Sequence, residues 1–384
     1  MRIETIPTPA YVLDEGKLIK NLKILRQVQE DTGCYILLAQ KAFSMFCEYP
    51  LIGKYLSGTT ASGLYEARLG HEEMGKENHI FSPAYRESEM EEIAEICDHV
   101  IFNSFSQLKK FQSSCEGRAS IGLRINPECS TQEEHAIYDP CAPGSRLGIT
   151  LKNFEQALSE EPELLKGVEG LHFHTLCEQN SDDLERTLQA VEEKFGKYLK
   201  QMKWLNMGGG HHITRADYDI DTLKRCICHM QEMYGVQVYL EPGEAIALNA
   251  GYLVTEVMDV VDNGMQTLIL DTSAACHMPD VLEMPYRPPL LGADEPGENA
   301  VTIRLGGPTC LSGDIIGDYS FSEPLKYGDI LMFGDMAIYT TCKNNTFNGM
   351  PLPDIWLRHG DKTMERLTDF GYEDFKGRLG RCRK

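Results

Sequence analysis

Several positions in the first two thirds of the sequence carry residues that could do chemistry together. Lys41 follows the apolar run ILLA, His172 and His174 alternate in HFHT, the glycines 208–210 follow WLNM, and Glu241 precedes Pro-Gly. An uncharged lysine can attack a carbonyl, and glycines let backbone N–H groups approach an anion. A fixed carboxylate can accept a charge-assisted hydrogen bond from a protonated ring nitrogen.

Each of these features, taken alone, also has a structural interpretation. Lys41 could lay its stem along apolar surface or pair with a carboxylate. The glycine triplet could form a tight turn, and Glu241 could form a salt bridge. His172 and His174 face the same side of a strand, which suits metal ligation or ring packing. We expect no metal, because the matching strand ends offer Lys, Ser and Gly rather than further His and Asp ligands.

Short apolar or β-branched runs recur eight times before residue 245, separated by stretches with helical spacing. They lie at 35–42, around Thr60, Phe81 and Phe102, in the run ending at Pro127, and at 170–175, 204–210 and 237–243. Eight strand–helix units over about 240 residues predict a parallel (β/α)8 barrel of the TIM type. A doubly wound open sheet is the second choice.

After Gly251 the sequence changes to β-rich runs separated by Gly, Pro and Asp turns. We therefore expect a barrel domain at 10–245 and a mostly β C-terminal domain at 246–384. The first residues, 1–9, are expected to join the second domain, because chain ends are often tied into a sheet.

The predicted barrel explains why the chemical residues recur at strand ends. The active site of such a barrel forms at the carboxyl ends of its strands. Lys41, the two histidines, the glycine triplet and Glu241 all occupy such positions, and so do Ser62, Asn103 and Arg124. We expect them to surround one site. A late loop of the barrel is also a frequent phosphate site, which favours anion binding by the glycines.

Composition excludes several classes of partner. A formal charge of −21 argues against nucleic-acid binding, which needs clustered Lys and Arg, and weakly favours a cationic ligand. No apolar run reaches the roughly 18 residues of a membrane span, and the first residues lack the pattern of a signal peptide. The 13 cysteines show no recurring metal-binding spacing. We expect a cytoplasmic protein with reduced thiols.

Seven segments together resemble the fold-type III, alanine racemase-like decarboxylases that use pyridoxal 5′-phosphate (PLP), across nearly the whole chain. They are TPAYVLDE, Lys41, HFHT, NMGGG, EPGEA, GGPTCLSGD and DMAIYTTCKNNTFNG. The segments LLAQKAFS, TASGLYEARLG, YDPCAPGSRLG, HFHTLCE and LEPGEA are most similar to the branch that acts on carboxyspermidine and carboxynorspermidine. The resemblance implies a decarboxylase of polyamine biosynthesis with a polyamine-like amino acid as substrate.

The resemblance also implies roles for residues of the barrel. Lys41 would hold the cofactor as a Schiff base and His174 would stack on its pyridine ring. Gly209 and Gly210 would bind the phosphate, and Glu241 would bind the pyridine nitrogen.

Further roles fall in the C-terminal domain. Tyr339 would reach the phosphate from the other subunit of a homodimer. Cys310, in GPTC, would be the acid that reprotonates the substrate carbanion, also across the dimer interface. The resemblance thus implies active sites that two subunits share.

Two departures from related decarboxylases bear on the substrate. Glu244 follows EPG where relatives usually carry Arg, and Leu311 follows Cys310 where relatives usually carry an acid. The extra amines of carboxyspermidine need carboxylate partners, since an unpaired buried ammonium costs several kcal/mol. Glu244, Asp280 and Asp314 are the candidates, and Asp271 and Arg287 are less direct ones.

Three rival functions remain open. Diaminopimelate decarboxylase is disfavoured by the missing Arg after EPG and by the missing C-E-S-G-D sequence. A racemase would use a tyrosine as second base where this chain has Cys310. A non-catalytic PLP-binding protein would have lost cofactor residues, whereas Lys41, Glu241 and Cys310 are all present.

Overall fold

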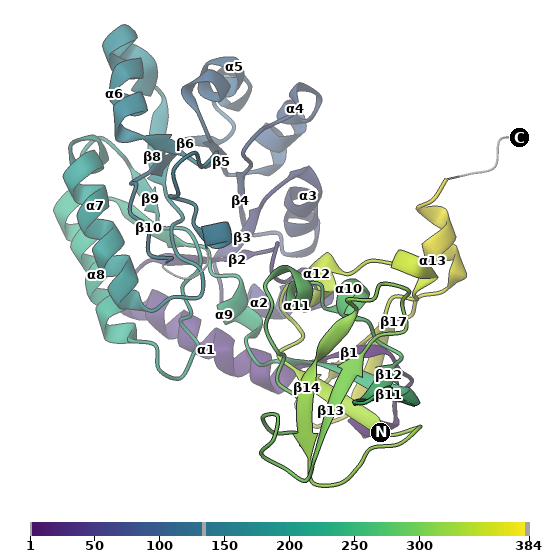
Figure 1. Cartoon of the computed structure of the whole chain (residues 1–384). Helices are drawn as coiled ribbons and strands as arrows, with labels where there is room; N and C mark the ends of the chain where they lie inside the picture. Colours follow the sequence, from purple (N-terminus) through teal and green to yellow (C-terminus); the bar gives the residue numbers. More distant parts are fainter. Residues whose placement is uncertain (1, 133–135, 381–384) are drawn as a thin grey trace, which may run out of the picture. The chain divides into compact units, whose positions relative to one another are not determined.

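A computed structural model describes residues 2–132 and 136–380, and they form two compact units (Figure 1). The barrel unit spans residues 21–246. The sheet unit combines residues 2–20 with residues 247–380. None of the described helices combines the length and the apolar character needed to span a bilayer.

The barrel unit is a closed ring of eight parallel strands. In ring order they are β2 (Tyr35–Ala39), β3 (Gly58–Ala61), β4 (Glu77–Phe81), β5 (His99–Phe102), β6 (Ser120–Asn126), β8 (Val168–His172), β9 (Trp204–Asn206) and β10 (Gln237–Leu240). The pairings of β5 with β6 and of β10 with β2 close the ring. The predicted fold class is confirmed, and all eight predicted runs form its strands. A two-residue strand, β7 (Ile149–Thr150), adds to β6 and was not predicted.

Helices connect the strands and lie outside the barrel (Figure 1). They are α1 (Glu15–Thr32), α2 (Tyr49–Ile52), α3 (Leu64–Glu73), α4 (Glu87–Ile96), α5 (Phe105–Cys115), α6 (Leu151–Glu160), α7 (Ser181–Leu199), α8 (Ile220–Tyr234) and α9 (Glu244–Ala247). Helix α7 illustrates the local cause. Leu184, Leu188, Val191 and Phe195 recur at helical spacing and are buried. Asn180 caps the helix by accepting a hydrogen bond from the N–H of Ser181.

One aromatic side chain explains two glycines in the barrel wall. Trp204 of β9 packs inside the barrel with Leu37, Ile101 and Tyr239. A Cβ atom at Gly170 would lie 2.0 Å from the Trp204 ring, and one at Gly122 would lie 2.2 Å from it. Because both distances are far below van der Waals contact, the two neighbouring strands need glycine there.

The sheet unit contains eight strands and four short helices in its described part. The strands are β1 (Ala10–Asp14), β11 (Gly251–Asp262), β12 (Gln266–Leu270), β13 (Val301–Gly306), β14 (Ile315–Phe321), β15 (Ile330–Gly334), β16 (Asp354–Arg358) and β17 (Met364–Thr368). The helices are α10 (Ala274–His277), α11 (Asp280–Glu283), α12 (Thr340–Lys343) and α13 (Tyr372–Gly377). The mostly β character predicted for the C-terminal part is therefore confirmed.

The first strand of the chain belongs to this sheet. β1 runs antiparallel to β11 and parallel to β16, and β15 pairs with β11 on its other edge. Ile6, Ala10, Val12, Val254 and Trp356 form a buried apolar cluster. The chain thus contributes a strand and an apolar anchor to the sheet unit before it enters the barrel.

Candidate active site

Lys41 follows β2 at the carboxyl end of the barrel and is solvent-accessible. Protein groups nevertheless surround it closely. Their desolvating effect lowers the pKa of Lys41, and the guanidinium of Arg124 lowers it further, while Glu241 and Glu244 act in the opposite direction. The net direction favours the uncharged amine, which is the form that attacks a carbonyl.

Glu241 follows β10 and is held by two donors in the barrel interior. Its side chain is buried, with 8% of the residue exposed. The amide of Asn206 donates to Oε1 at 2.7 Å, and the His172 ring nitrogen Nε2 lies 3.3 Å from Oε2. Burial alone would raise the pKa of Glu241, but His172 and the Asn206 hydrogen bond hold it well below its usual range. Glu241 is therefore an ionised carboxylate.

Asn206 cannot turn its amide freely, because its other end is also bound. Its oxygen Oδ1 accepts the N–H of Gly208 at 2.9 Å. Its NH2 group must then face Glu241, whose carboxylate is the acceptor of this hydrogen bond. This residue received no role from the sequence, since one Asn in WLNM carries no local signal of its partner.

The glycine loop after β9 is shaped by close approaches to backbone. Gly208 and Gly210 have φ of +67° and +82°. A Cβ atom at Gly209 would lie 2.3 Å from the carbonyl oxygen of Glu241, and one at Gly210 would lie 2.1 Å from that of Leu176. These positions require glycine, because a side chain at Gly209 or Gly210 would collide with neighbouring backbone.

His174 is bound to this loop. Its Nδ1 accepts the N–H of Gly209 at 2.8 Å, so in the neutral ring the proton sits on Nε2. Burial lowers the pKa of His174 well below its usual value, and the positive charges of Lys41 and Arg124 act in the same direction. The ring is therefore neutral and fixed in orientation, as a ring that packs on a cofactor would need to be.

Arg124 is the buried cation of the barrel interior. It lies on β6, its guanidinium sits 4.5 Å from the centre of the Phe81 ring, and Nη2 donates to the carbonyl oxygen of His174 at 3.2 Å. Burial lowers the pKa of Arg124 to about 10, while Glu241 stabilises its charge. Its strand-end position was recognised in the sequence, but its electrostatic action on Lys41 depends on tertiary placement.

Glu244 begins α9 and pairs with a histidine. Its Oε2 lies 2.9 Å from Nε2 of His212, and both side chains are nearly buried. Binding of a substrate amine by Glu244 stays a prediction, and it would have to share the carboxylate with His212. The spacing of His212 after the glycines gave no reason to expect this partner.

The remaining predicted residues lie in the sheet unit. Cys310 is exposed in the loop after β13, and its N–H donates to the Asn348 side chain at 2.8 Å. Asp314 is buried and anchors the same loop. It accepts hydrogen bonds from the hydroxyls of Ser273 and Thr309, and from the N–H of Ala275. Asp314 therefore has a structural task, and its contact with substrate stays a prediction.

Asp280 begins α11 and Tyr339 directly precedes α12, both in the sheet unit. Asp280 forms an ion pair with Lys343, which also pairs with Glu283. Tyr339 adopts a left-handed backbone, with φ of +56°, just before α12. Such strain in a bulky residue is typical of functional positions. The roles of Asp280 in substrate binding and of Tyr339 and Cys310 in a shared site stay predictions.

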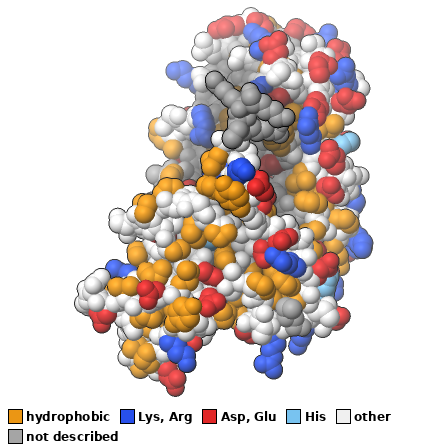
Figure 2. All heavy atoms as spheres, turned by 90° about the vertical axis from the view of Figure 1, so that its right-hand side faces the viewer, with side chains coloured by type: hydrophobic (Ala, Val, Ile, Leu, Met, Phe, Trp, Pro, Cys, Tyr) orange, Lys and Arg blue, Asp and Glu red, His pale blue; other side chains and the backbone are white. Residues whose placement is uncertain are grey.

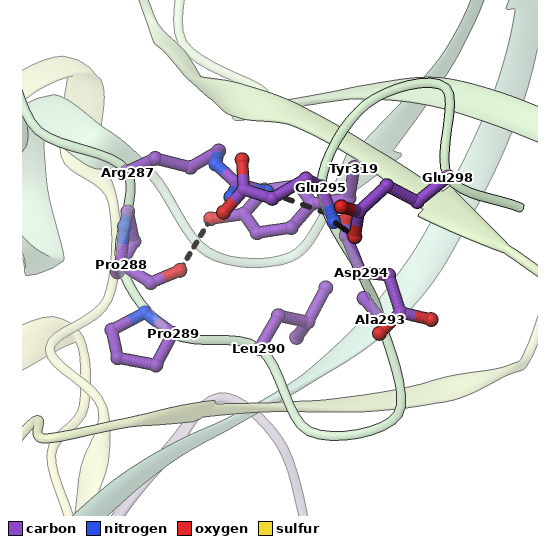
Figure 3. A pocket seen from close by; sticks show the side chains of 9 residues that line it. All are labelled: Arg287, Pro288, Pro289, Leu290, Ala293, Asp294, Glu295, Glu298 and Tyr319. Carbon is purple, nitrogen blue, oxygen red and sulfur yellow. Dashed lines mark hydrogen bonds and ion pairs between the residues drawn. The ribbon is translucent and has the colours of Figure 1, made fainter.

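Arg287 lines a pocket of about 400 Å³ in the sheet unit, where it has a structural role (Figure 3). The guanidinium of Arg287 lies 4.8 Å from the centre of the Tyr319 ring and pairs with Glu295. The Tyr319 hydroxyl donates to the carbonyl oxygen of Pro288 at 2.7 Å. Arg287 therefore already serves as the cation of this acidic pocket.

The barrel residues fit PLP. A backbone loop that tolerates no Cβ atom suits a phosphate group, and an ionised Glu241 suits a protonated pyridine nitrogen. Lys41 offers an accessible amine whose pKa is lowered, and His174 offers a neutral ring of fixed orientation. Lys41 follows β2, His174 follows β8, the glycine loop follows β9 and Glu241 follows β10. These four strands are consecutive in the barrel ring.

Comparisons with known proteins agree with this chemistry. The family model described as pyridoxal-dependent decarboxylase, C-terminal sheet domain, matches residues 10–337. The carboxynorspermidine/carboxyspermidine decarboxylase of Campylobacter jejuni is 44% identical, over 98% of this chain and 99% of that protein. The carboxyaminopropylagmatine decarboxylase of Synechocystis is 41% identical, over 99% of this chain and 97% of that protein.

Solved structures agree as well. The crystal structure of carboxynorspermidine decarboxylase from Campylobacter jejuni, complexed with norspermidine, superposes with a TM-score of 0.90 and 43% identity, covering 97% of this chain and 100% of that one. A diaminopimelate decarboxylase from Helicobacter pylori has a TM-score of 0.83 at 17% identity, over 98% and 97% of the two chains, which shows a shared fold.

Proposed function

Because this chain belongs to the pyridoxal-dependent decarboxylases, we propose that it decarboxylates carboxyspermidine and carboxynorspermidine, with PLP as cofactor. The observation that carries the proposal is the constellation at one end of the barrel. Lys41, the glycine loop and the ionised Glu241 meet there, and each matches one part of PLP. The products would be spermidine and norspermidine, which places the enzyme in polyamine biosynthesis.

The chain's own groups divide the work as follows. When bound, PLP accepts the electron pair left on the substrate α-carbon as carbon dioxide departs. Lys41 would supply the amine that holds the cofactor. Glu241 would accept a charge-assisted hydrogen bond from the protonated pyridine nitrogen and so stabilise its charge. His174 would pack against the ring. Cys310 would deliver a proton to the α-carbon.

Homodimer formation belongs to the same proposal. Cys310 and Tyr339 would act in the barrel of the partner subunit, so each site would use two chains. Two apolar residues near Cys310 are exposed: Leu311, which follows it, at 42%, and Phe347 at 45%. Phe347 precedes Asn348, whose side chain accepts the Cys310 N–H. Figure 2 shows hydrophobic side chains gathered over the sheet unit. Exposed apolar surface of this kind is typical of an association surface.

We place the enzyme in the cytoplasm.

Substrate turnover by the purified holoenzyme tests the proposal. Carboxyspermidine, carboxynorspermidine, carboxyaminopropylagmatine and meso-diaminopimelate are supplied separately, and the amine products are separated by chromatography. We expect product from the first two at rates within about 200-fold of each other, because one methylene changes binding by about 1–3 kcal/mol. Turnover of diaminopimelate without turnover of either carboxylated polyamine would overturn the proposal.

Turnover of carboxyaminopropylagmatine distinguishes a guanidinium-bearing tail from an ammonium-bearing tail. Carboxyaminopropylagmatine, named for the Synechocystis relative, ends in a guanidinium where carboxyspermidine ends in an ammonium. A guanidinium is planar and forms paired hydrogen bonds with a carboxylate, whereas an ammonium is a compact point charge. We expect slower turnover of the guanidinium substrate. A higher kcat/KM for carboxyaminopropylagmatine than for carboxyspermidine would show that the enzyme prefers a guanidinium tail. The assignment as a decarboxylase would still hold.

A further inference from the structure

A recess lies at the carboxyl end of β3 and the first turn of α3. Its volume is about 460 Å³, and its walls are residues 62–66, Arg86 and Glu89, all within the barrel unit. Pockets that take small ligands commonly measure about 300–1,000 Å³. The recess is therefore large enough to hold part of a small molecule.

Strand register places this recess beside Lys41. Ala39 of β2 pairs with Thr60 of β3, and the N–H of Gln40 donates to the Thr60 carbonyl at 3.2 Å. Lys41 lies two residues after the end of β2, and Ser62, the first residue of the recess, directly follows the end of the neighbouring β3. The charge of Lys41 also acts on Glu66. A ligand attached to the Lys41 region could therefore extend directly into the recess.

The walls of the recess suit a cation. Glu66 lies in the first turn of α3, with Oε2 accepting the Ser62 N–H at 2.6 Å. Burial raises the pKa of Glu66, so a neighbouring positive charge would stabilise its carboxylate. Tyr65 is 83% exposed, with the Arg68 guanidinium 5.9 Å from the centre of its ring, and the opposite face of the ring can accept an ammonium.

The second carboxylate is held only loosely by an arginine. Glu89 lies 3.8 Å from Nε of Arg86, whose side chain is 82% exposed. An exposed pair at this distance contributes little, so an incoming ammonium can take the place of Arg86. By contrast, the acids singled out from the sequence have shorter contacts. Glu244 contacts His212 at 2.9 Å, and Asp314 accepts three hydrogen bonds.

We propose that this recess binds the ammonium-bearing tail of the substrate, with Glu66 and Glu89 as its carboxylate partners. The inference rests on the proposed function and deepens it, because it names residues that select a cationic tail. Tyr65 covers the tail from the solvent side, and Arg86 opposes its charge. Glu66 and Glu89 act on binding of the tail and take no part in bond breaking.

Conservative variants separate this role from a structural one. Gln at position 66 can still accept the Ser62 N–H through its amide oxygen, so Glu66→Gln removes the charge while keeping that hydrogen bond. Glu89→Gln removes the second charge. Arg86→Gln removes the opposing charge. Glu73→Gln is the matched control, because Glu73 lies on the same helix, is exposed and is outside the recess.

The experiment measures binding of the triamine spermidine to each PLP-loaded variant by calorimetry, with kcat and KM for carboxyspermidine. We expect Glu66→Gln and Glu89→Gln each to raise Kd and KM about tenfold, the size of one charge-assisted hydrogen bond, with kcat nearly unchanged. Arg86→Gln should lower Kd, and Glu73→Gln should leave it unchanged. The truncated substrate 2,4-diaminobutanoate, which lacks the tail, should show no difference among the variants.

Opposite outcomes would overturn the inference. Unchanged Kd in both glutamate variants would exclude the recess as the tail site, as would weaker binding in Arg86→Gln. If Glu66→Gln does not fold, the opposite changes in Kd expected for Glu89→Gln and Arg86→Gln still test the inference. Wild-type protein that fails to decarboxylate carboxyspermidine refutes the proposed function. Wild-type turnover combined with unaffected variants refutes only this inference.

Discussion

Replacing Glu241 with Gln changes one atom and leaves the shape of the side chain intact. In the native site both carboxylate oxygens face donors, the Asn206 amide at 2.7 Å and His172 Nε2 at 3.3 Å. A glutamine offers only one acceptor oxygen. Since Gly208 fixes the Asn206 amide, the Gln oxygen must face Asn206, and its NH2 group must face His172.

The structure indicates the size of the effect on folding. His172 would have to accept at Nε2 and carry its proton on Nδ1, which is buried and has no hydrogen-bond partner among the described residues. An unsatisfied buried polar group costs about 1–3 kcal/mol. The Asn206 contact also loses its charge assistance. We expect the free energy of unfolding of the apoprotein to fall by about 1–3 kcal/mol.

The same substitution tests the catalytic assignment. A neutral Gln can no longer hold a proton on the pyridine nitrogen by charge, so the loss exceeds a simple hydrogen bond. We expect kcat to fall by about 10- to 100-fold, corresponding to about 1.4–3 kcal/mol of lost stabilisation. Urea unfolding of the apoprotein and decarboxylation by fully PLP-loaded protein measure the two effects. A variant with wild-type kcat at full cofactor occupancy would refute the role given to Glu241.

Three further substitutions have defined outcomes. Arg124→Gln should raise the pKa of Lys41, because it removes a positive charge that lowers it. The pH profile of the rate of PLP uptake by apoprotein, measured by stopped-flow absorbance, should therefore have its midpoint at a higher pH. An unchanged or lower midpoint would contradict this. Gly170→Ala should destabilise the barrel by about 1–3 kcal/mol or more through its clash with Trp204, measured by urea unfolding and partly relieved in a Trp204→Leu background. Asp314→Ala should cost about 1–3 kcal/mol because it leaves three donors unpaired, whereas Asp314→Asn should cost less, since the Thr309 hydroxyl can turn to accept; equal unfolding midpoints for the two variants would argue against the anchoring role.

The barrel could be predicted because its signals are local. The eight parallel strands are short apolar or β-branched runs with a polar or glycine position at or near the carboxyl end, and helical patterns separate them. Strand ends in such a barrel point to one face, so Lys41, His174 and Glu241 could be assigned to one site before any contact was known. β7 escaped prediction because a strand of two residues has no periodicity to detect.

Side-chain pairing could not be predicted in the same way. Glu244 meets His212 from 32 residues away, and Asp280 meets Lys343 from 63 residues away. Such contacts depend on how loops are placed after folding, and neither partner shows a local pattern that reveals the other. Trp204 illustrates the same limit within the barrel. The need for glycine at 122 and 170 follows only from the position of the Trp204 ring, which a Cβ atom at either residue would strike.

The surroundings of Lys41 depend partly on the local sequence and partly on tertiary placement. The sequence shows Lys41 after an apolar run, and in the structure the pKa of this solvent-accessible lysine is lowered. Desolvation by the surrounding protein is the largest cause. Arg124 contributes positive charge from β6, an effect that follows from the barrel closing and not from the run ILLA.

Reduction of the PLP-loaded protein with borohydride tests the central claim most directly. Borohydride converts a Schiff base into a stable secondary amine, so the lysine that holds the cofactor keeps it through proteolysis and mass spectrometry. The account predicts that the phosphopyridoxyl group is found on Lys41 and that Lys41→Ala protein retains none and releases no polyamine product. A label on another lysine, or undiminished product formation by Lys41→Ala, would contradict it.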